Sequence, residues 1–193
     1  MTDPVAAYKL LRRLRNDLIH ITSKRQRALS CRYSTGGGNP RLIYAPVKEE
    51  VEWDEPRGVS KIRTSQSVFL EEGNTVVARV NQRIADITGL SMKSAEDLQV
   101  QNYGIGGRYE PHYDAEDNEN ERIATFLLYM SDVSLLFKGS AVFWYNLHKN
   151  GNVDLNTEHA RCPVLRGNKW VANKWIHEFG QEFRRPCSLS YWE

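Results

Sequence analysis

The chain has 193 residues, with 26 Lys and Arg against 24 Asp and Glu, so its formal net charge is +2. This length fits one ordinary domain, which can bury a core without help from metals or disulfides. An apolar fraction of 40% and the lack of any run of about 18 apolar residues exclude an integral membrane protein. Its 13 glycines and 7 prolines exclude collagenous and low-complexity chains.

Residues 1–30 predict an amphipathic helix with a basic face. Asp3 can cap this helix, Pro4 fits its first turn, and leucines recur at every fourth position from 10 to 18. No aromatic or glycine residues are interleaved with the basic ones, so we expect a solvated surface and no nucleic-acid partner. The first residues show no basic region followed by an apolar core, and we expect no signal peptide there.

A linker-like stretch at 34–56 precedes a second predicted helix. Asn74 or Thr75 can cap this helix, and Gly89 is placed to end it. Its apolar stripe consists of Val77, Val80, Ile84 and Ile87. We therefore expect an element that packs on the core and carries no chemistry.

From residue 97 onward the pattern changes to short β-type runs separated by turn residues. Such a series predicts a β-sandwich or barrel-like core with helices outside it. The predicted strands are 98–103, 109–114, 123–129, 141–145, 169–177 and 188–191.

A possible metal site begins with His112 and Asp114, whose side chains leave an extended strand on the same face. A histidine, an aspartate two residues later and a distant histidine are typical of the triad that binds non-haem Fe(II). His159 is the preferred third ligand, and His148 is an alternative in what looks like an exposed loop. Zinc would accept the same ligands.

The strand predicted at 169–177 supports the iron interpretation. Lys169, Trp175 and His177 share one face of this strand by period two, together with Val171 and Asn173. A lysine near the metal suits a cosubstrate that chelates iron through a 2-oxo acid and presents a second carboxylate. Hydrolysis by zinc would not require that lysine.

A family resemblance is carried by residues 102–114, 122–125, 129–133, 139–147, 159–170, 175–178 and 184–187. These segments resemble the catalytic domain of the animal prolyl 4-hydroxylase alpha subunit. With 31–57, the resemblance spans most of residues 31–193. It implies a mainly β fold with flanking helices, built on a double-stranded β-helix (jelly-roll) core. It also implies a 2-oxoglutarate- and Fe(II)-dependent dioxygenase that hydroxylates C4 of peptidyl-proline and converts 2-oxoglutarate to succinate.

The resemblance also assigns roles to residues. It implies that iron is held by His112, Asp114 and His159, and that 2-oxoglutarate is bound by Lys169 and Tyr103. Tyr109, Arg122 and Trp175 match positions that line the peptidyl-proline site, and His177 matches a catalytic histidine.

The family's biology adds further expectations. Cys162 and Cys187 match a structural disulfide, which fits the lumen of the endoplasmic reticulum, while Cys31 lacks its partner. L-ascorbate is implied as a cofactor, a proline-rich, collagen-like peptide as the substrate and protein disulfide isomerase as the beta subunit.

The chain departs from the family in two places within residues 31–193. A strand and a helix of the family are missing after Arg57, and a glycine-rich strand with a threonine for 2-oxoglutarate is missing after Ser134. We therefore expect residues 1–30 to be a remnant of the assembly region and 31–193 to be a catalytic domain with two deletions. The alternative function is an inactive shortened isoform that at most binds or assembles.

Overall fold

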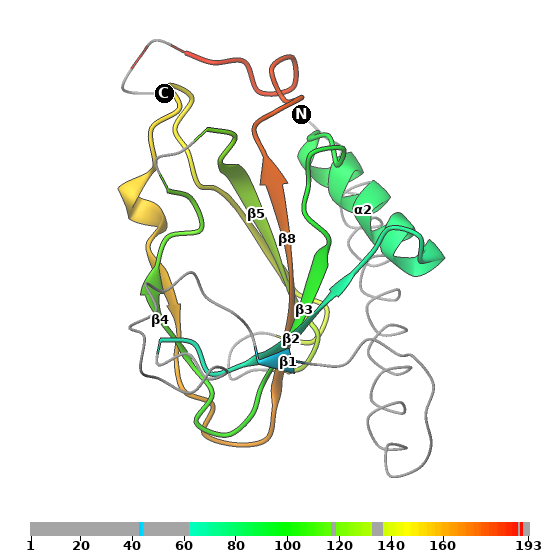
Figure 1. Cartoon of the computed structure of the whole chain (residues 1–193), viewed down its shortest axis with the longest axis vertical. Helices are drawn as coiled ribbons and strands as arrows, with labels where there is room; N and C mark the ends of the chain where they lie inside the picture. The colour runs from blue at the N-terminus through cyan, green and yellow to red at the C-terminus, as the bar shows by residue number, and fades with distance from the viewer. Residues whose placement is uncertain (1–42, 45–61, 117–118, 133–136, 189, 191–193) are drawn as a thin grey trace, which may run out of the picture.

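A computed structural model describes residues 43–44, 62–116, 119–132, 137–188 and 190 (Figure 1). The helix expected within residues 1–30 lies outside these ranges. So do Arg57 and Ser134, the residues after which segments of the family are missing.

The described part is mainly β-structure, arranged as a six-stranded sheet and a two-stranded ribbon (Figure 1). In the large sheet the antiparallel order is β1 (Ile43–Tyr44), β2 (Gln66–Leu70), β3 (Leu98–Tyr103), β8 (Lys169–His177), β5 (Arg122–Tyr129) and β6 (Ala141–Tyr145). The ribbon pairs β4 (Tyr109–His112) with β7 (His159–Arg161), and the 3-10 helix η1 (Leu155–Thr157) precedes β7.

Helix α2 (Thr75–Thr88) begins and ends where the sequence predicts. The Asn74 side chain accepts a hydrogen bond of 2.9 Å from the Val76 N–H and so caps the first turn. Gly89 adopts φ 74°, and its N–H donates to the Ala85 carbonyl at 2.8 Å. Glycine adopts this left-handed conformation without steric cost, so the helix stops there.

The main core lies between α2 and one face of the large sheet. Ile84 and Val80 on the helix are fully buried, and burying each such side chain contributes about 1.5–3 kcal/mol. They belong to one cluster with side chains of β2, β3 and β8, namely Val68, Leu98, Val100, Ala172 and Ile176. The helix therefore covers the face of the sheet opposite the ribbon (Figure 1).

The alternation of side chains along β8 divides the molecule into a core side and a site side. Ala172 and Ile176 point into the core, whereas Asn173 and Trp175 point to the opposite face. The shared face predicted for Lys169 to His177 is confirmed.

Several boundaries differ from expectation. Strand β4 ends at His112, and Ser188 and Ser190 belong to no strand. Strands β2 and β7 were not expected, because each is short and lacks a clear alternation of apolar and polar residues. Among the described residues, no helix combines the length and apolarity needed to cross a membrane.

Cys162 and Cys187, which the sequence analysis expects to form a disulfide, are both free and exposed in the structure. The two thiols are held beside different parts of the chain. The Val164 N–H, just after Cys162, donates to the Gly107 carbonyl, while the Ser188 N–H, just after Cys187, donates to the Lys149 carbonyl.

We predict that Ile84→Ala lowers the free energy of unfolding by about 2–5 kcal/mol, because it leaves a cavity in the main core. Leu155→Ala is the control, since that side chain is 71% exposed and its truncation should change stability by less than about 0.5 kcal/mol. Chemical denaturation would measure both. Equal effects would contradict the position of the core.

Candidate metal centre

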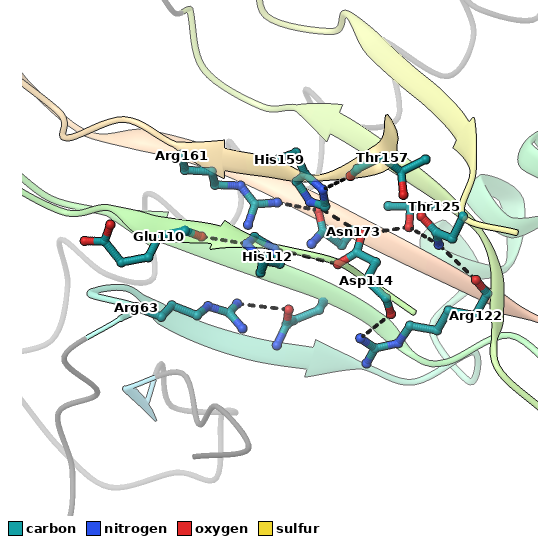
Figure 2. Close-up of polar contacts among 12 residues, drawn as sticks. Arg63, Glu110, His112, Asp114, Arg122, Thr125, Thr157, His159, Arg161 and Asn173 are labelled. Carbon is teal, nitrogen blue, oxygen red and sulfur yellow. Dashed lines mark hydrogen bonds and ion pairs between the residues drawn. The ribbon is translucent and has the colours of Figure 1, made fainter. Parts of the chain in front are cut away.

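His112, Asp114 and His159 converge between the large sheet and the ribbon (Figure 2). His112 and His159 are paired residues of β4 and β7, and Asp114 follows β4. Asp114 lies 3.8 Å from His112 Nε2 through Oδ1 and 3.7 Å from His159 Nε2 through Oδ2. One ligand atom from each side chain lies within 4.8 Å of the others.

Backbone carbonyls orient both histidine rings. Nδ1 of His112 lies 2.8 Å from the Glu110 carbonyl, and Nδ1 of His159 lies 2.9 Å from the Thr157 carbonyl. A carbonyl can only accept, so each Nδ1 carries the proton and each Nε2 keeps its lone pair for a metal. Burial lowers the pKa of His112 to about 4, which keeps this imidazole neutral near pH 7.

The carboxylate of Asp114 is buried and held by a short chain of hydrogen bonds. The Thr125 hydroxyl donates to its Oδ2 at 2.7 Å, and Asn146 Nδ2 donates to the Thr125 Oγ1 at 3.0 Å. Because Thr125 and Asn146 are fully buried, this chain sets the direction of the carboxylate. Strand β5 and the residue after β6 thereby determine the position of a residue that follows β4.

Aromatic rings border the cluster on two sides. Tyr109 stacks on His112 with ring centroids 3.6 Å apart, and Trp144 meets His159 edge-on at 5.1 Å. Each imidazole therefore has an aromatic ring packed against it.

A first cavity of about 830 Å³ opens beside His112 and Asp114. Its walls include all four residues expected at the peptide site or in catalysis, namely Tyr109, Arg122, Trp175 and His177. The Arg122 guanidinium lies 4.1 Å from the centre of the Trp175 ring. The Trp175 indole N–H is buried and has no acceptor in the described part of the chain.

Glu96 belongs to this cavity and was missed by the sequence analysis. Its carboxylate accepts from Arg122 Nε at 2.5 Å and lies 3.1 Å from His177 Nε2. His177 Nδ1 lies 2.6 Å from the Asn120 carbonyl, so both of its ring nitrogens have partners. One acidic residue therefore positions two of the expected site residues, and no spacing in the sequence indicates this.

A second cavity of about 360 Å³ lies beside His159 and contains Lys169, Tyr129 and Trp144. Lys169 therefore shares a cavity with the candidate ligand His159. Tyr103 is fully buried next to this site, opposite Lys169 in the pairing of β3 and β8. Arg161, another residue without an assigned role in the sequence analysis, also lines the cavity.

His148, the alternative ligand, does not join the cluster. It lies 3.6 Å from Asp154 on an exposed loop. Two imidazoles and one carboxylate remain, a donor set that fits Fe(II) and that zinc would also accept.

Residues 98–177 match the 2OG-Fe(II) oxygenase superfamily. Residues 98–177 therefore form a 2OG-Fe(II) oxygenase domain. It is 43% identical to prolyl 4-hydroxylase subunit alpha-1 of Homo sapiens over 91% of this chain and 45% of that one. It is 38% identical to subunit alpha-3 of Bos taurus over 83% of this chain and 41% of the relative. The chain therefore spans less than half of the length of these relatives.

Solved structures of prolyl hydroxylases share the fold of this oxygenase. The viral collagen prolyl hydroxylase vCPH from Paramecium Bursaria Chlorella virus-1, in its 2OG complex, aligns with a TM-score of 0.53 and 25% identity, over 61% of this chain and 80% of that one. A Pseudomonas putida prolyl-4-hydroxylase aligns with a TM-score of 0.54 and 16% identity, over 85% and 88%. The expected jelly-roll fold is confirmed, and membership of the superfamily implies Fe(II) and 2-oxoglutarate.

We predict that Thr125→Val weakens Mn(II) binding about 10- to 100-fold, because it removes the hydrogen bond that orients the candidate carboxylate ligand. Thr88→Val is the matched control, since the Thr88 hydroxyl donates to the Ile84 carbonyl at the end of α2. Titration calorimetry would measure both affinities. An unchanged affinity of the Thr125→Val protein would show that this bond does not support a metal ligand.

Proposed function

We propose that this oxygenase hydroxylates C4 of peptidyl-proline in collagen-like sequences and converts 2-oxoglutarate to succinate. The observation that carries the proposal is the position of the His112, Asp114 and His159 cluster between two cavities. One cavity has aromatic walls and the other has a lysine, which suits a reaction between a peptide and an anionic cosubstrate.

In this proposal His112 Nε2, His159 Nε2 and one Asp114 oxygen hold Fe(II). When bound, iron and 2-oxoglutarate supply the oxidising chemistry. The protein's own residues bind and orient the iron and the 2-oxoglutarate. The fixed tautomers of both histidines support these roles, because each Nε2 is an acceptor aimed toward the carboxylate.

Lys169 is the proposed partner of the far carboxylate of 2-oxoglutarate, with Tyr103 beside it. Lys169 is half-buried, and its ammonium lies 5.8 Å from the Tyr129 ring centre. A fixed cation of this kind favours a dicarboxylate over a monocarboxylate. Tyr103 can contribute its hydroxyl, which already takes part in hydrogen bonds with Gln101 and Arg161.

The first cavity is the proposed site of the peptidyl-proline. Tyr109 and Trp175 offer flat apolar surfaces to a pyrrolidine ring, and Arg122 can donate to a peptide carbonyl. His177, tied through Glu96 to Arg122, is the proposed catalytic histidine beside them.

The wider context follows the relatives and is part of the proposal. It comprises L-ascorbate as a cofactor, protein disulfide isomerase as a beta subunit and the lumen of the endoplasmic reticulum as the compartment. Residues 31–193 would form the catalytic domain and residues 1–30 a remnant of an assembly region.

We predict that the protein forms succinate from 2-oxoglutarate when given Fe(II), ascorbate and a proline-rich, collagen-like peptide. His112→Ala and Asp114→Ala should reduce this to background, because each removes a ligand. His148→Ala should retain full activity, since the His148 side chain pairs with Asp154 on a loop outside the cluster. Mass spectrometry of the peptide would detect the hydroxyl group. A folded protein without turnover would contradict the proposal.

We propose a second candidate function, a shortened form that binds the cosubstrate or assembles without turnover. The alignment of this chain with the human subunit has 238 positions, more than the 193 residues of the chain. Parts of the human subunit within the aligned region therefore have no counterpart in this chain. Among the described residues the ribbon also has only two strands, so β7 pairs with a strand, β4, on one edge only.

The second candidate predicts an upward shift of the melting temperature by Mn(II) and 2-oxoglutarate, without succinate in the activity assay. At 100 times the dissociation constant, a ligand stabilises the folded state by about 2.7 kcal/mol. Differential scanning fluorimetry would measure the shift. Succinate formation coupled to proline hydroxylation would reject this candidate, and neither turnover nor a shift would reject both its binding form and the first proposal.

A further inference from the structure

Arg161 is a buried cation next to the candidate metal centre. It lies two residues after His159 on β7, so both side chains leave the strand on the same side. Its side chain is only 5% exposed. Nη1 donates to the Tyr103 hydroxyl at 3.0 Å. Nη2 donates to Asn173 Oδ1 at 3.1 Å (Figure 2).

Arg161 and Lys169 both contribute to the wall of the second cavity. Lys169 is the cross-strand partner of Tyr103 in the pairing of β3 and β8, and the side chains of such partners start about 5 Å apart. Because Arg161 donates to the Tyr103 hydroxyl, its guanidinium is brought toward Lys169. Both cations line the cavity beside His159.

Neither cation has a carboxylate partner among the described residues. The acceptors of Arg161 are a neutral hydroxyl and a neutral amide, and Lys169 faces the ring of Tyr129. Burial and the charge of Arg161 both lower the pKa of Lys169. Two like charges that are withdrawn from water without a counter-charge destabilise a fold, and such arrangements are typical of binding sites.

We propose that Arg161 and Lys169 together bind the far carboxylate of a 2-oxo dicarboxylic acid. This inference rests on the proposed function and adds a second cation to its cosubstrate site. Arg161 has five N–H donors, and its two hydrogen bonds leave three of them for a ligand. Trp144 lines the same cavity, and its buried indole N–H has no acceptor among the described residues.

The test is anaerobic titration of 2-oxoglutarate into the full chain loaded with Mn(II), followed by calorimetry. Arg161→Gln should weaken binding about 10- to 100-fold, because charge-assisted hydrogen bonds are lost. Arg108→Gln is the matched control, since Arg108 is an exposed arginine paired with Glu110. The affinity of the Arg108→Gln protein for 2-oxoglutarate should stay within twofold of the wild type. 2-Oxopentanoate lacks the far carboxylate and should lose less than threefold in the Arg161→Gln protein.

Each result decides the proposal. Wild-type affinity or tighter binding in the Arg161→Gln protein would overturn it, and so would an equal loss for 2-oxopentanoate. If Lys169→Gln weakens binding while Arg161→Gln does not, the proposed function survives and this inference fails. A wild-type protein that binds no 2-oxoglutarate rejects both.

A second variant covers the case in which Arg161→Gln does not fold. Arg161→Lys keeps the charge but loses the planar fork of donors. We expect a loss of about threefold to tenfold for 2-oxoglutarate, between wild type and the glutamine variant. An unchanged affinity would overturn the proposal.

Discussion

The alternation of side chains along β8 is the constraint on which the rest of the structure depends. This strand lies between β3 and β5, so it is paired on both edges and cannot shift its register without disturbing the whole sheet. One of its faces packs under α2, and the other faces the cavities. A slip by one residue would move Lys169 and Trp175 into the core and expose Ile176.

The candidate ligands depend on this frame because the ribbon is too small to be stable alone. Asp114 is fixed from β5 through Thr125, and Arg161 joins β7 to β3 and β8 through Tyr103 and Asn173. Buried polar networks of this kind stabilise a single arrangement only when their members are paired. The large sheet therefore positions the candidate metal centre, and α2 stabilises the sheet from behind.

Much of this arrangement could be predicted from the sequence. The bounds of β3 and β8 follow from period-two patterns between turn residues, and α2 follows from Asn74, its apolar stripe and Gly89. Strand β7 could not be predicted, because three residues show no period. Glu96 and Arg161 were missed for a related reason, since their importance comes from contacts across strands and not from spacing along the chain. The expected bridge between Cys162 and Cys187 came from family resemblance, and the two cysteines lie beside different segments of this chain.

The central claim is that His112, Asp114 and His159 form one iron site to which 2-oxoglutarate binds directly. Anaerobic titration of the protein with Fe(II) and 2-oxoglutarate tests it, because a 2-oxo acid chelated to ferrous iron gives a visible absorption band. We expect one Fe(II) per chain, a band that saturates with 2-oxoglutarate, and loss of the band in His159→Ala but not in His148→Ala. A folded protein that gives no band, or a His159→Ala protein that gives the full band, would contradict the account.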